Sequence, residues 1–490
     1  MARFAFALLL GALVSLSCSG DARPPAPDAQ TTPDAQVHMD AAPTADASLP
    51  DASLPDAAPD TGVDASPDAS APTLRDDGLA PGSWSAQVAA ATDPDALGAA
   101  FTAAGYVPPA GAYAMAARVL PGVGQPAFRF YSLGDTGFEY SPGDYWPAST
   151  VKLTAAVGAL HFLHGLGLTG AAQVSFTDND GTYNGTVENI YDLALSISDN
   201  VSYNRLVEIA GFDALNDQVL VEANGLPQMV IQRRYTTGDD LRTSPAITWS
   251  EGSLNGVIPQ RVGTGQHPEC PNEGNCVTLY ELLEVMRRVT LHDEIPATHR
   301  FPLASADVAG LHQALLDATT WLADGATAAL GHPVTVYNKP GYVPDNDRLD
   351  HGLVVDDVTG DRYLIALSLP EATTSEADLS ELAEQVLAVL LADASPAPAL
   401  QLTAGVALPV QVDGLGGQTY RIQVDAPGAD EVQIWADWWH LPAVDPPATN
   451  GTPFHRLEYT FSVVGRRQLV VLALQNGQPI GVRVLDVDLP

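Results

Sequence analysis

The spacing of hydrophobic positions divides the chain into three regions. Between about residues 84 and 392, helical periods and strand-like runs are mixed, whereas 399–490 holds short alternating runs separated by turn signals. Residues 19–78 carry neither period, because short units such as PDA and ADASLP repeat there without aromatic residues. The pattern predicts a mixed α and β domain over 79–394, a β-sandwich over 395–490 and an extended tether before them.

The elements expected in the mixed domain are typical of an α+β fold. Strand-like runs at 112–120 and 126–140 flank a Pro-Gly-Val-Gly turn and predict a hairpin. The run 150–164 is apolar nearly all round, which indicates a buried helix. Helices placed between an early hairpin and late strands favour α+β architecture. We also expect helices at 187–197, 201–210, 279–289, 303–322 and 376–391, and strands at 334–338, 352–355 and 363–369.

Charge narrows the range of partners. The chain of 490 residues has a net charge of −37, and 12 aspartates lie between Asp21 and Asp77. Nucleic acid and anionic lipid both attract clustered basic residues, so neither is expected as a partner. Of the 22 basic residues 20 are arginine, and the two lysines are Lys152 and Lys339.

The amino-terminal pattern predicts export. Arg3 precedes an apolar run over 4–16 that is too short to span a bilayer and is typical of a signal peptide. Cys18 follows Val-Ser-Leu-Ser and resembles the acylated cysteine of bacterial lipoproteins, with ordinary signal cleavage as the alternative. We therefore interpret residues 1–18 as a lipoprotein-type signal peptide and predict a lipid-anchored protein of the periplasm or outer membrane.

Two further cysteines, Cys270 and Cys276, lie close together in the loop HPECPNEGNC. In an exported chain this spacing favours a local disulfide over a metal site, which would need two more ligands. His161 and His164 have the spacing of a metal pair, but no further ligand accompanies them, so a structural role is favoured. No metal or cofactor is expected.

Candidate chemistry begins at Ser149, in Trp-Pro-Ala-Ser-Thr-Val-Lys. The proline before a helix start places Ser149 at a helix N-terminus, where free amides and the helix dipole favour an oxyanion. Lys152 projects from the same face, and a buried lysine can be neutral enough to take the hydroxyl proton. Taken alone, the pattern more often marks a helix cap beside an ordinary lysine.

A second motif, Ser198-Asp-Asn, lies at the junction of two expected helices. Ser198 can relay a proton and Asn200 can hold a substrate amide, although each also caps helices well. In a third motif, Glu-Gly-Ser-Leu-Asn, Glu251 can activate a water that Asn255 helps to position. The alternative for Glu251 is a solvated loop acid.

A fourth motif, Lys-Pro-Gly, ends the strand expected at 334–338. Lys339 offers positive charge at the strand edge, and Gly341 permits close approach of a ligand to the backbone. The alternative is a strand followed by an ordinary Pro-Gly turn.

Taken together, Ser-x-x-Lys, Ser-Asp-Asn, Glu-x-x-Leu-Asn and Lys-x-Gly, in that order and with both lysines inside them, resemble the serine β-lactamases, class A in particular, and more distantly the penicillin-binding proteins. The resemblance covers about 105–392 and implies an antiparallel sheet flanked by helices, with a helical subdomain. It implies these roles: Ser149 as nucleophile, Lys152 as its activator, Ser198 as proton relay, Glu251 with Asn255 for the deacylating water, Lys339 for the substrate carboxylate, Asn200 and Gly341 at the substrate, and the amides of Ser149 and Tyr342 as oxyanion hole.

Three departures qualify the resemblance. Pro340 stands where the family has a threonine or serine, so carboxylate recognition falls to Lys339 and Arg348. Trp249 stands where class A enzymes usually carry an arginine, and residues 256–276 look like an insertion. The sequence therefore supports acylation better than fast deacylation.

We predict a monomeric active-site-serine hydrolase that acts on β-lactams through an acyl-enzyme. The alternatives are a D-Ala-D-Ala carboxypeptidase or transpeptidase acting on peptidoglycan, and a penicillin-binding sensor or inactive relative. In the C-terminal module Trp435, Trp438 and Trp439 can form a sugar-stacking platform, although core or interface packing is favoured.

Overall fold

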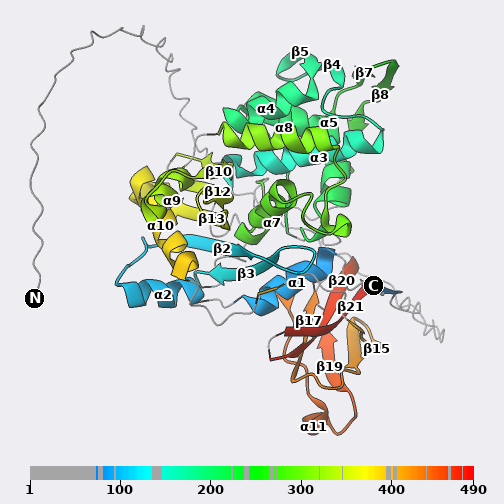
Figure 1. Cartoon of the computed structure of the whole chain (residues 1–490). Coiled ribbons are helices and arrows are strands. Elements are labelled where there is room, and N and C mark those ends of the chain that lie inside the picture. The colour runs from blue at the N-terminus through cyan, green and yellow to red at the C-terminus, as the bar shows by residue number, and fades with distance from the viewer. Residues whose placement is uncertain are drawn as a thin grey trace, which may run out of the picture. The chain divides into compact units, whose positions relative to one another are not determined.

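A computed structural model describes most of the chain after residue 72 (Figure 1). The signal peptide, Cys18, Trp438 and most of the expected tether lie outside the described residues. Those described are 73–75, 81–92, 95–134, 146–221, 224–226, 228–236, 242–264, 270, 274–318, 321–344, 346–392, 399–400, 406–436, 439–461, 465–476 and 478–489.

The main sheet is antiparallel and is built from segments far apart in the sequence. Its strands are β2 (Tyr113–Leu120), β3 (Ala127–Ser132), β10 (Thr335–Asn338), β11 (Gly341–Tyr342), β12 (Asp347–Val355) and β13 (Arg362–Pro370). They run in the order β10-β12-β13-β2-β3, with β11 paired to β12. The hairpin expected from the sequence is β2–β3, in which Ala117 faces Phe130.

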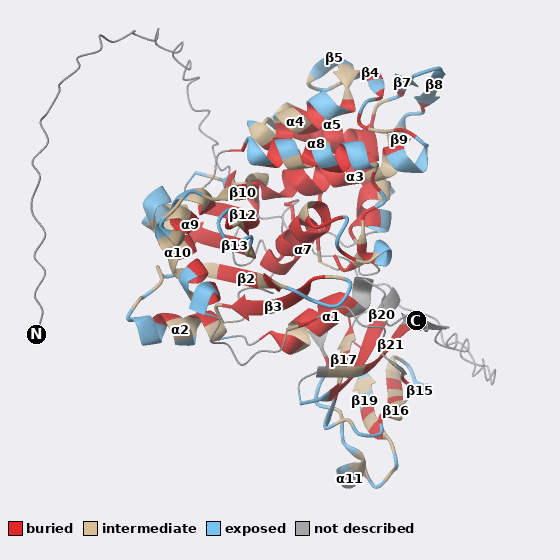
Figure 2. Cartoon of the chain, viewed as in Figure 1, coloured by how far each residue is buried: buried red, intermediate tan, exposed pale blue. Residues whose placement is uncertain are grey.

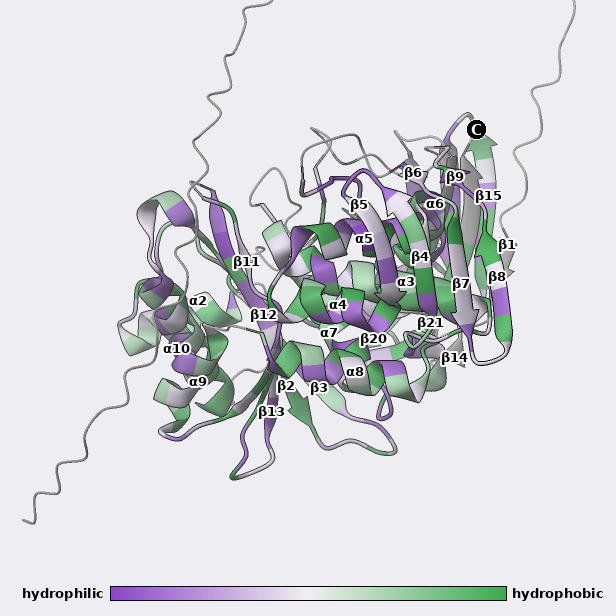
Figure 3. Cartoon of the chain, turned by 90° about the horizontal axis from the view of Figure 1, so that it is seen from above, coloured by the Kyte–Doolittle hydropathy of each residue, from purple (hydrophilic) through white to green (hydrophobic). Residues whose placement is uncertain are grey.

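Helices cover both faces of this sheet, because side chains along its strands alternate between two cores. On β13, Tyr363 and Ile365 enter one core, whereas Leu364 and Ala366 enter the other. The first core is closed by α2 (Ala96–Ala104), α9 (Leu322–Leu330) and α10 (Glu376–Ala392), which lie together beside the sheet in Figure 3. The second is closed by α7 (Leu279–Thr290) and the helical subdomain.

The helical subdomain surrounds α3 (Lys152–Gly165), which a 3-10 turn over Ala148–Val151 precedes. As the apolar pattern predicted, α3 is buried along most of its length (Figure 2). Around it lie α4 (Val187–Ser196), α5 (Asn200–Ala210), α8 (Ser305–Leu316) and the short α6 (Phe212–Ala214), which continues into a π-turn over Leu215–Val219. A sheet in the order β5-β4-β7-β8 closes one side; its strands are β4 (Gln173–Asp178), β5 (Gly181–Thr186), β7 (Ile247–Glu251) and β8 (Leu254–Ile258), followed by the pair β6 (Thr243–Ser244) and β9 (Arg261–Val262).

The single helix expected over 303–322 is wrong. The structure has two helices there, because α8 ends at Leu316 and α9 begins at Leu322. A buried carboxylate from the sheet starts the second helix: Asp350 Oδ2 accepts the backbone N–H of Trp321 at 2.9 Å and that of Leu322 at 3.2 Å. This cap comes from a strand that follows in the sequence, so local periodicity could not reveal it.

The C-terminal region forms two packed sheets, as the alternating pattern predicted. A three-stranded sheet, β15-β16-β19, packs its β16 residues against β17 and β20 of a larger sheet. That sheet also recruits a strand from the segment expected to be tether, because Thr73–Arg75 forms β1 and pairs with β21. The strands are β14 (Val406–Ala407), β15 (Val410–Gly416), β16 (Thr419–Val424), β17 (Glu431–Ala436), β18 (Trp439–His440), β19 (His455–Thr460), β20 (Gly465–Gln475) and β21 (Gln478–Leu489), with the short α11 (Pro447–Asn450) between β18 and β19.

Helix α1 (Pro81–Ala91) contributes to two cores at once. Trp84 and Val88, four residues apart, enter the core between the main sheet, α7 and the helical subdomain, whereas Ala86 joins a cluster on β20 and β21. Trp435 packs against that second cluster, in keeping with core packing rather than an exposed platform.

A buried ionic cluster holds α1 against α7. Glu284 accepts hydrogen bonds from Trp84 Nε1 at 3.2 Å, Arg287 Nε at 2.8 Å and Arg288 Nε at 2.7 Å. Burial of Glu284 acts to raise its pKa, but the two guanidinium groups outweigh burial and lower the pKa to about 2. The carboxylate therefore stays charged in the folded protein.

We expect Glu284→Gln to lower the free energy of unfolding by about 3–5 kcal/mol at pH 7, because two buried guanidinium groups lose their counter-charge. Because the folded pKa lies below the unfolded value of about 4.3, this stabilisation is present above about pH 4.3 and is lost as the pH falls toward 2. Denaturant unfolding as a function of pH measures both. Glu294→Gln, which breaks an exposed pair with Arg362, is the control and should change stability by less than about 1 kcal/mol. Equal effects of the two substitutions would contradict the assignment.

Candidate active site

A cavity of about 490 Å³ opens beside Ser149. Its walls come from the turn before α3, the start of α5, the segment 233–236, and the β11–β12 turn. The lining residues are Trp146, Ala148, Ser149, Asn200, Arg233, Arg234, Tyr235, Thr236, Tyr342, Val343, Pro344 and Asn346. Ser149, Asn200 and Tyr342, expected from separate motifs, therefore face one space.

The turn that carries Ser149 has an unusual backbone. Ala148 has a φ of 50°, in the left-handed region that non-glycine residues seldom adopt. Tyr235 holds this residue by donating its hydroxyl to the carbonyl oxygen of Ala148. The backbone N–H of Lys152 donates to the carbonyl oxygen of Ser149, so Ser149 and Lys152 share one tight turn.

Strand β11 fits against this turn because its first residue is Gly341. A Cβ atom at that position would lie 3.0 Å from the carbonyl oxygen of Pro147 and 3.1 Å from Ala148 Cβ. Gly341 thus permits the backbone of β11 to lie against the turn that carries Ser149. This places Tyr342, the next residue, along the same cavity as Ser149.

Two lysines meet on one serine oxygen. Lys152 Nζ donates to Ser198 Oγ at 3.1 Å and to Asn200 Oδ1 at 2.7 Å, and also to the carbonyl oxygen of Ser198. Lys339 Nζ donates to Ser198 Oγ at 3.0 Å and to the carbonyl oxygen of Pro340 at 2.9 Å. With both lysines as donors, Ser198 Oγ acts as acceptor and keeps its own proton to donate elsewhere.

Burial lowers the pKa of both lysines, so each ammonium group gives up its proton more readily than usual. Desolvation, and then the charge of Lys339, lower the pKa of Lys152 to about 7, although Asp199 opposes the shift. Burial likewise lowers the pKa of Lys339 to about 8, against the attraction of Asp350. A large fraction of Lys152 is therefore neutral near pH 7 and can act as a proton acceptor.

Glu251 and Asn255 do not join this group. Glu251, at the end of β7, accepts hydrogen bonds from Thr169 N at 2.9 Å and Thr169 Oγ1 at 2.6 Å. Thr169 follows the C-terminal end of α3, whereas Ser149 precedes its N-terminal end, and 14 helical residues span about 21 Å. Asn255 is exposed on β8, where it pairs with Ser250. The expected position beside the nucleophile is therefore corrected: the motif forms a β-hairpin that closes the far end of α3.

Arg348 is also committed elsewhere. Its Nη1 donates to the carbonyl oxygen of Thr374 at 2.5 Å and its Nη2 to Glu371 Oε1 at 3.1 Å. Tyr342 donates its hydroxyl to the same Glu371 oxygen at 3.2 Å. Arg348 is therefore linked to Tyr342 of β11 through Glu371. It does not line the cavity, contrary to the expectation that it binds substrate.

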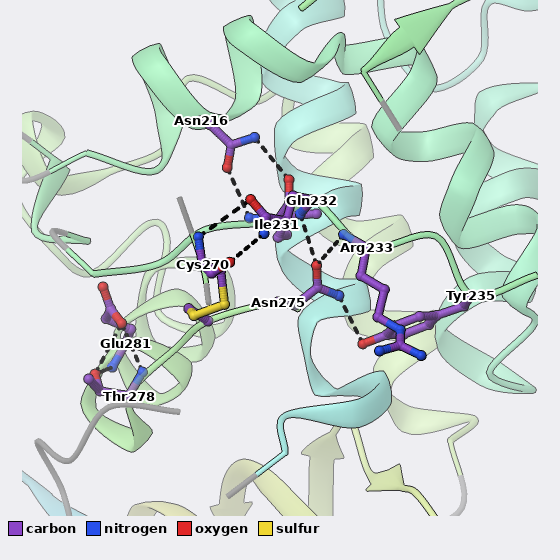
Figure 4. The surroundings of a disulfide bond; sticks show 10 residues. Asn216, Ile231, Gln232, Arg233, Tyr235, Cys270, Asn275, Thr278 and Glu281 are labelled. Carbon is purple, nitrogen blue, oxygen red and sulfur yellow. Dashed lines mark hydrogen bonds between the residues drawn. A yellow bond between two sulfur atoms is a disulfide. The ribbon is translucent and has the colours of Figure 1, made fainter. Parts of the chain in front are cut away.

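The disulfide expected between Cys270 and Cys276 is present, with 5.6 Å between their Cα atoms. It frames Asn275, which is buried behind the cavity wall (Figure 4). Asn275 Oδ1 accepts the backbone N–H groups of Gln232 and Arg233, both at 2.9 Å. Its Nδ2 donates to the hydroxyl of Tyr235 at 3.0 Å, and so fixes the residue that holds Ala148.

Sequence reasoning missed the wall residues Arg233 and Tyr235, and Asn275, which supports them. They lie in a stretch without a clear period, and their role comes from contacts between segments about 40 residues apart. The one available signal was the disulfide loop, which could have drawn attention to the five residues between its cysteines, Asn275 among them.

No group of three or more His, Cys, Asp or Glu side chains within the described ranges is arranged to hold a metal ion. His161 and His164 therefore stay a pair without further ligands in this part of the chain. Among the helices that the structure describes, none is long and apolar enough to cross a membrane.

Comparison with known proteins finds one matching family model. A model of the β-lactamase enzyme family matches residues 147–390. No curated protein sequence matches the chain. Similar solved structures include a PBP-A mutant in an acyl-enzyme complex with penicillin G, at 15% identity and a TM-score of 0.42, covering 62% of this chain and 98% of that one. The extended-spectrum β-lactamase TLA-3 (12% identity, TM-score 0.43, 61% and 99% covered) and a β-lactamase from Sphaerobacter thermophilus (16%, 0.41, 61% and 98%) are also similar.

We expect the two lysines to titrate well below the ordinary value of about 10.4. Because the chain has two lysines, isotopic labelling of lysine yields two side-chain signals whose NMR shifts can be followed with pH. Lys152 should titrate near 7 and Lys339 near 8. Lys339→Met should raise the pKa of Lys152, since it removes a neighbouring positive charge. Titration of both lysines near 10 would contradict the site as described.

We expect Tyr235→Phe to slow covalent reaction at Ser149, because it releases the carbonyl oxygen of Ala148. The free energy of unfolding should change little. Asn275→Ala should slow the reaction and also lower the free energy of unfolding by at least about 2 kcal/mol, since it leaves two backbone N–H groups without their acceptor. Thermal unfolding and the rate of covalent labelling separate these effects. Tyr337→Phe, which keeps the ring contact with His312, is the matched control and should change neither.

Proposed function

Residues 147–390 belong to the β-lactamase enzyme family, and so to the serine β-lactamase and penicillin-binding superfamily, and on that premise we propose that this protein captures β-lactams as acyl-enzymes on Ser149 and releases them slowly. The observation that carries the proposal is the sharing of Ser198 Oγ by Lys152 and Lys339 beside the cavity that Ser149 lines.

The contacts suggest how acylation would proceed. Neutral Lys152 takes the proton of Ser149 as Oγ attacks the lactam carbonyl carbon. The new C–O bond replaces the C–N bond, and Ser198 passes a proton to the departing nitrogen, with the two lysines as its source. The helix N-terminus and the backbone amides of Ser149 and Tyr342 would stabilise the oxyanion.

Slow release is proposed because of what lines the cavity. None of the described cavity-lining residues is a carboxylate, and Glu251 is bound to Thr169. Asp239 and Asp240 lie outside the described residues. Without a carboxylate to activate water, an acyl-enzyme on Ser149 would hydrolyse slowly.

The same steps would serve a D-Ala-D-Ala peptide, where the C–N bond of the terminal peptide replaces that of the lactam. A carboxypeptidase or transpeptidase is therefore the second candidate. Pro340 supports it, because the β-lactamase motif has a hydroxyl residue at that position. On the sequence pattern alone we also propose export to the cell envelope through the signal peptide and Cys18, where either substrate would be met.

We expect the full-length chain to be labelled by a fluorescent penicillin, and Ser149→Ala to abolish the label. The label should persist for minutes or longer after excess penicillin is removed, and Glu251→Gln should leave that lifetime unchanged. Gel fluorescence and intact mass measure the label, and a chromogenic cephalosporin measures turnover.

Each result bears on a different part of the proposal. Fast steady-state hydrolysis of the cephalosporin would replace slow release by β-lactamase activity. A longer-lived label in Glu251→Gln would return Glu251 to the deacylation step. Equal labelling of Ser149→Ala would remove Ser149 as the nucleophile.

A further inference from the structure

Arg233 is an exposed cation on the wall of the Ser149 cavity. Its guanidinium carbon lies 4.8 Å from the centre of the Trp146 ring, which lines the same cavity. Trp146 is fixed in turn, because its backbone N–H donates to Asp347 Oδ2 at 2.7 Å. The guanidinium group thus lies over the ring of a wall residue, and Arg233 is exposed where it lines the cavity.

Hydrogen bonds hold both backbone groups of Arg233, its N–H and its carbonyl oxygen. Its N–H donates to Asn275 Oδ1 at 2.9 Å, and its carbonyl oxygen accepts the hydroxyl of Tyr203 at 3.0 Å. Asn275 belongs to the disulfide loop, and Tyr203 is buried in α5. An arginine that extends from so fixed a backbone loses less freedom when it binds a ligand.

Among the described residues, no carboxylate pairs with the guanidinium group of Arg233. The adjacent Arg234 is buried and pairs with Asp180 and with Glu208, the latter at 2.9 Å. Arg233 forms no ion pair with any described residue, and its one charged-group contact is the stack on Trp146. In a chain of net charge −37, such a cation beside a nucleophile suits an anionic ligand.

The position of Arg233 indicates which part of a substrate it meets. In the proposed mechanism the leaving nitrogen lies at Ser198, where both lysines converge. Arg233 lies instead with Trp146 and next to the segment that holds Ala148 through Tyr235. That side of Ser149 would face the acyl half, which stays attached to the nucleophile.

We infer that Arg233 binds a carboxylate on the acyl half of the substrate, so that the site prefers acyl donors with an anionic side chain. The fork of N–H groups on an arginine matches the two oxygens of a carboxylate. This inference rests on the proposed function for its choice of ligand, and it deepens that function by naming a substrate class.

The test is equilibrium binding to the full-length Ser149→Ala protein, which needs no acylation. The probes are carbenicillin and benzylpenicillin, which share the ring carboxylate and differ by one carboxylate on the acyl side chain. We expect carbenicillin to bind about tenfold or more tightly by calorimetry, in the range of hydrogen bonds to charged groups. Adding Arg233→Gln should remove this preference by weakening the binding of carbenicillin more than that of benzylpenicillin, while Arg233→Lys should retain part of the preference.

The matched control is Arg362→Gln, which removes an exposed arginine paired with Glu294 and should leave both affinities unchanged. Equal affinity for the two penicillins, equal weakening of both by Arg233→Gln, or no binding of either would overturn the inference. Failure of the proposed function has a separate signature, since it is the absence of covalent labelling on Ser149 in the unsubstituted chain.

Discussion

The burial of two ammonium groups against one serine oxygen is the constraint around which the site is organised. Lys152 and Lys339 come from a helix and from a strand end nearly 190 residues later, and both are fully buried. An ammonium group in the interior is unfavourable, so burial shifts each lysine toward its neutral form, and the charge of Lys339 lowers the pKa of Lys152 further. What would otherwise destabilise the fold thereby supplies a base. Asn200 and the backbone of Ser198 provide the acceptors that make the arrangement tolerable.

This constraint needs rigid walls, and the structure supplies them from both directions. On one side Gly341 lets β11 lie against the nucleophile's turn, and Arg348 braces that strand through Glu371. On the other side Asn275 ties a segment without regular structure to the disulfide loop. A cavity wall without regular secondary structure must satisfy its backbone groups through side chains, and a buried asparagine does so with both halves of its amide.

The C-terminal sheets are connected to the catalytic region through α1. Two faces of that helix pack into different cores. Ala86 packs on β20 and β21, whereas Trp84 donates a hydrogen bond to the buried carboxylate of Glu284. The sandwich also takes up β1 from before the catalytic region, so strands from both ends of the described chain meet in one sheet. The two regions therefore share packing, although their strands form separate sheets.

The sequence by itself determined the elements and the chemically active groups that act over short distances. Apolar periods identified α3 as buried, and the motifs placed Ser149 and Lys152 on one turn, because helix turns and caps are set by residues three or four apart. Only the tertiary structure decided which distant groups meet. It brought Lys339 to Ser198, took Glu251 to the other end of α3, and made Arg233 the exposed cation of the cavity wall. Such pairings depend on how sheets and helices pack, and local sequence patterns do not specify contacts between distant segments.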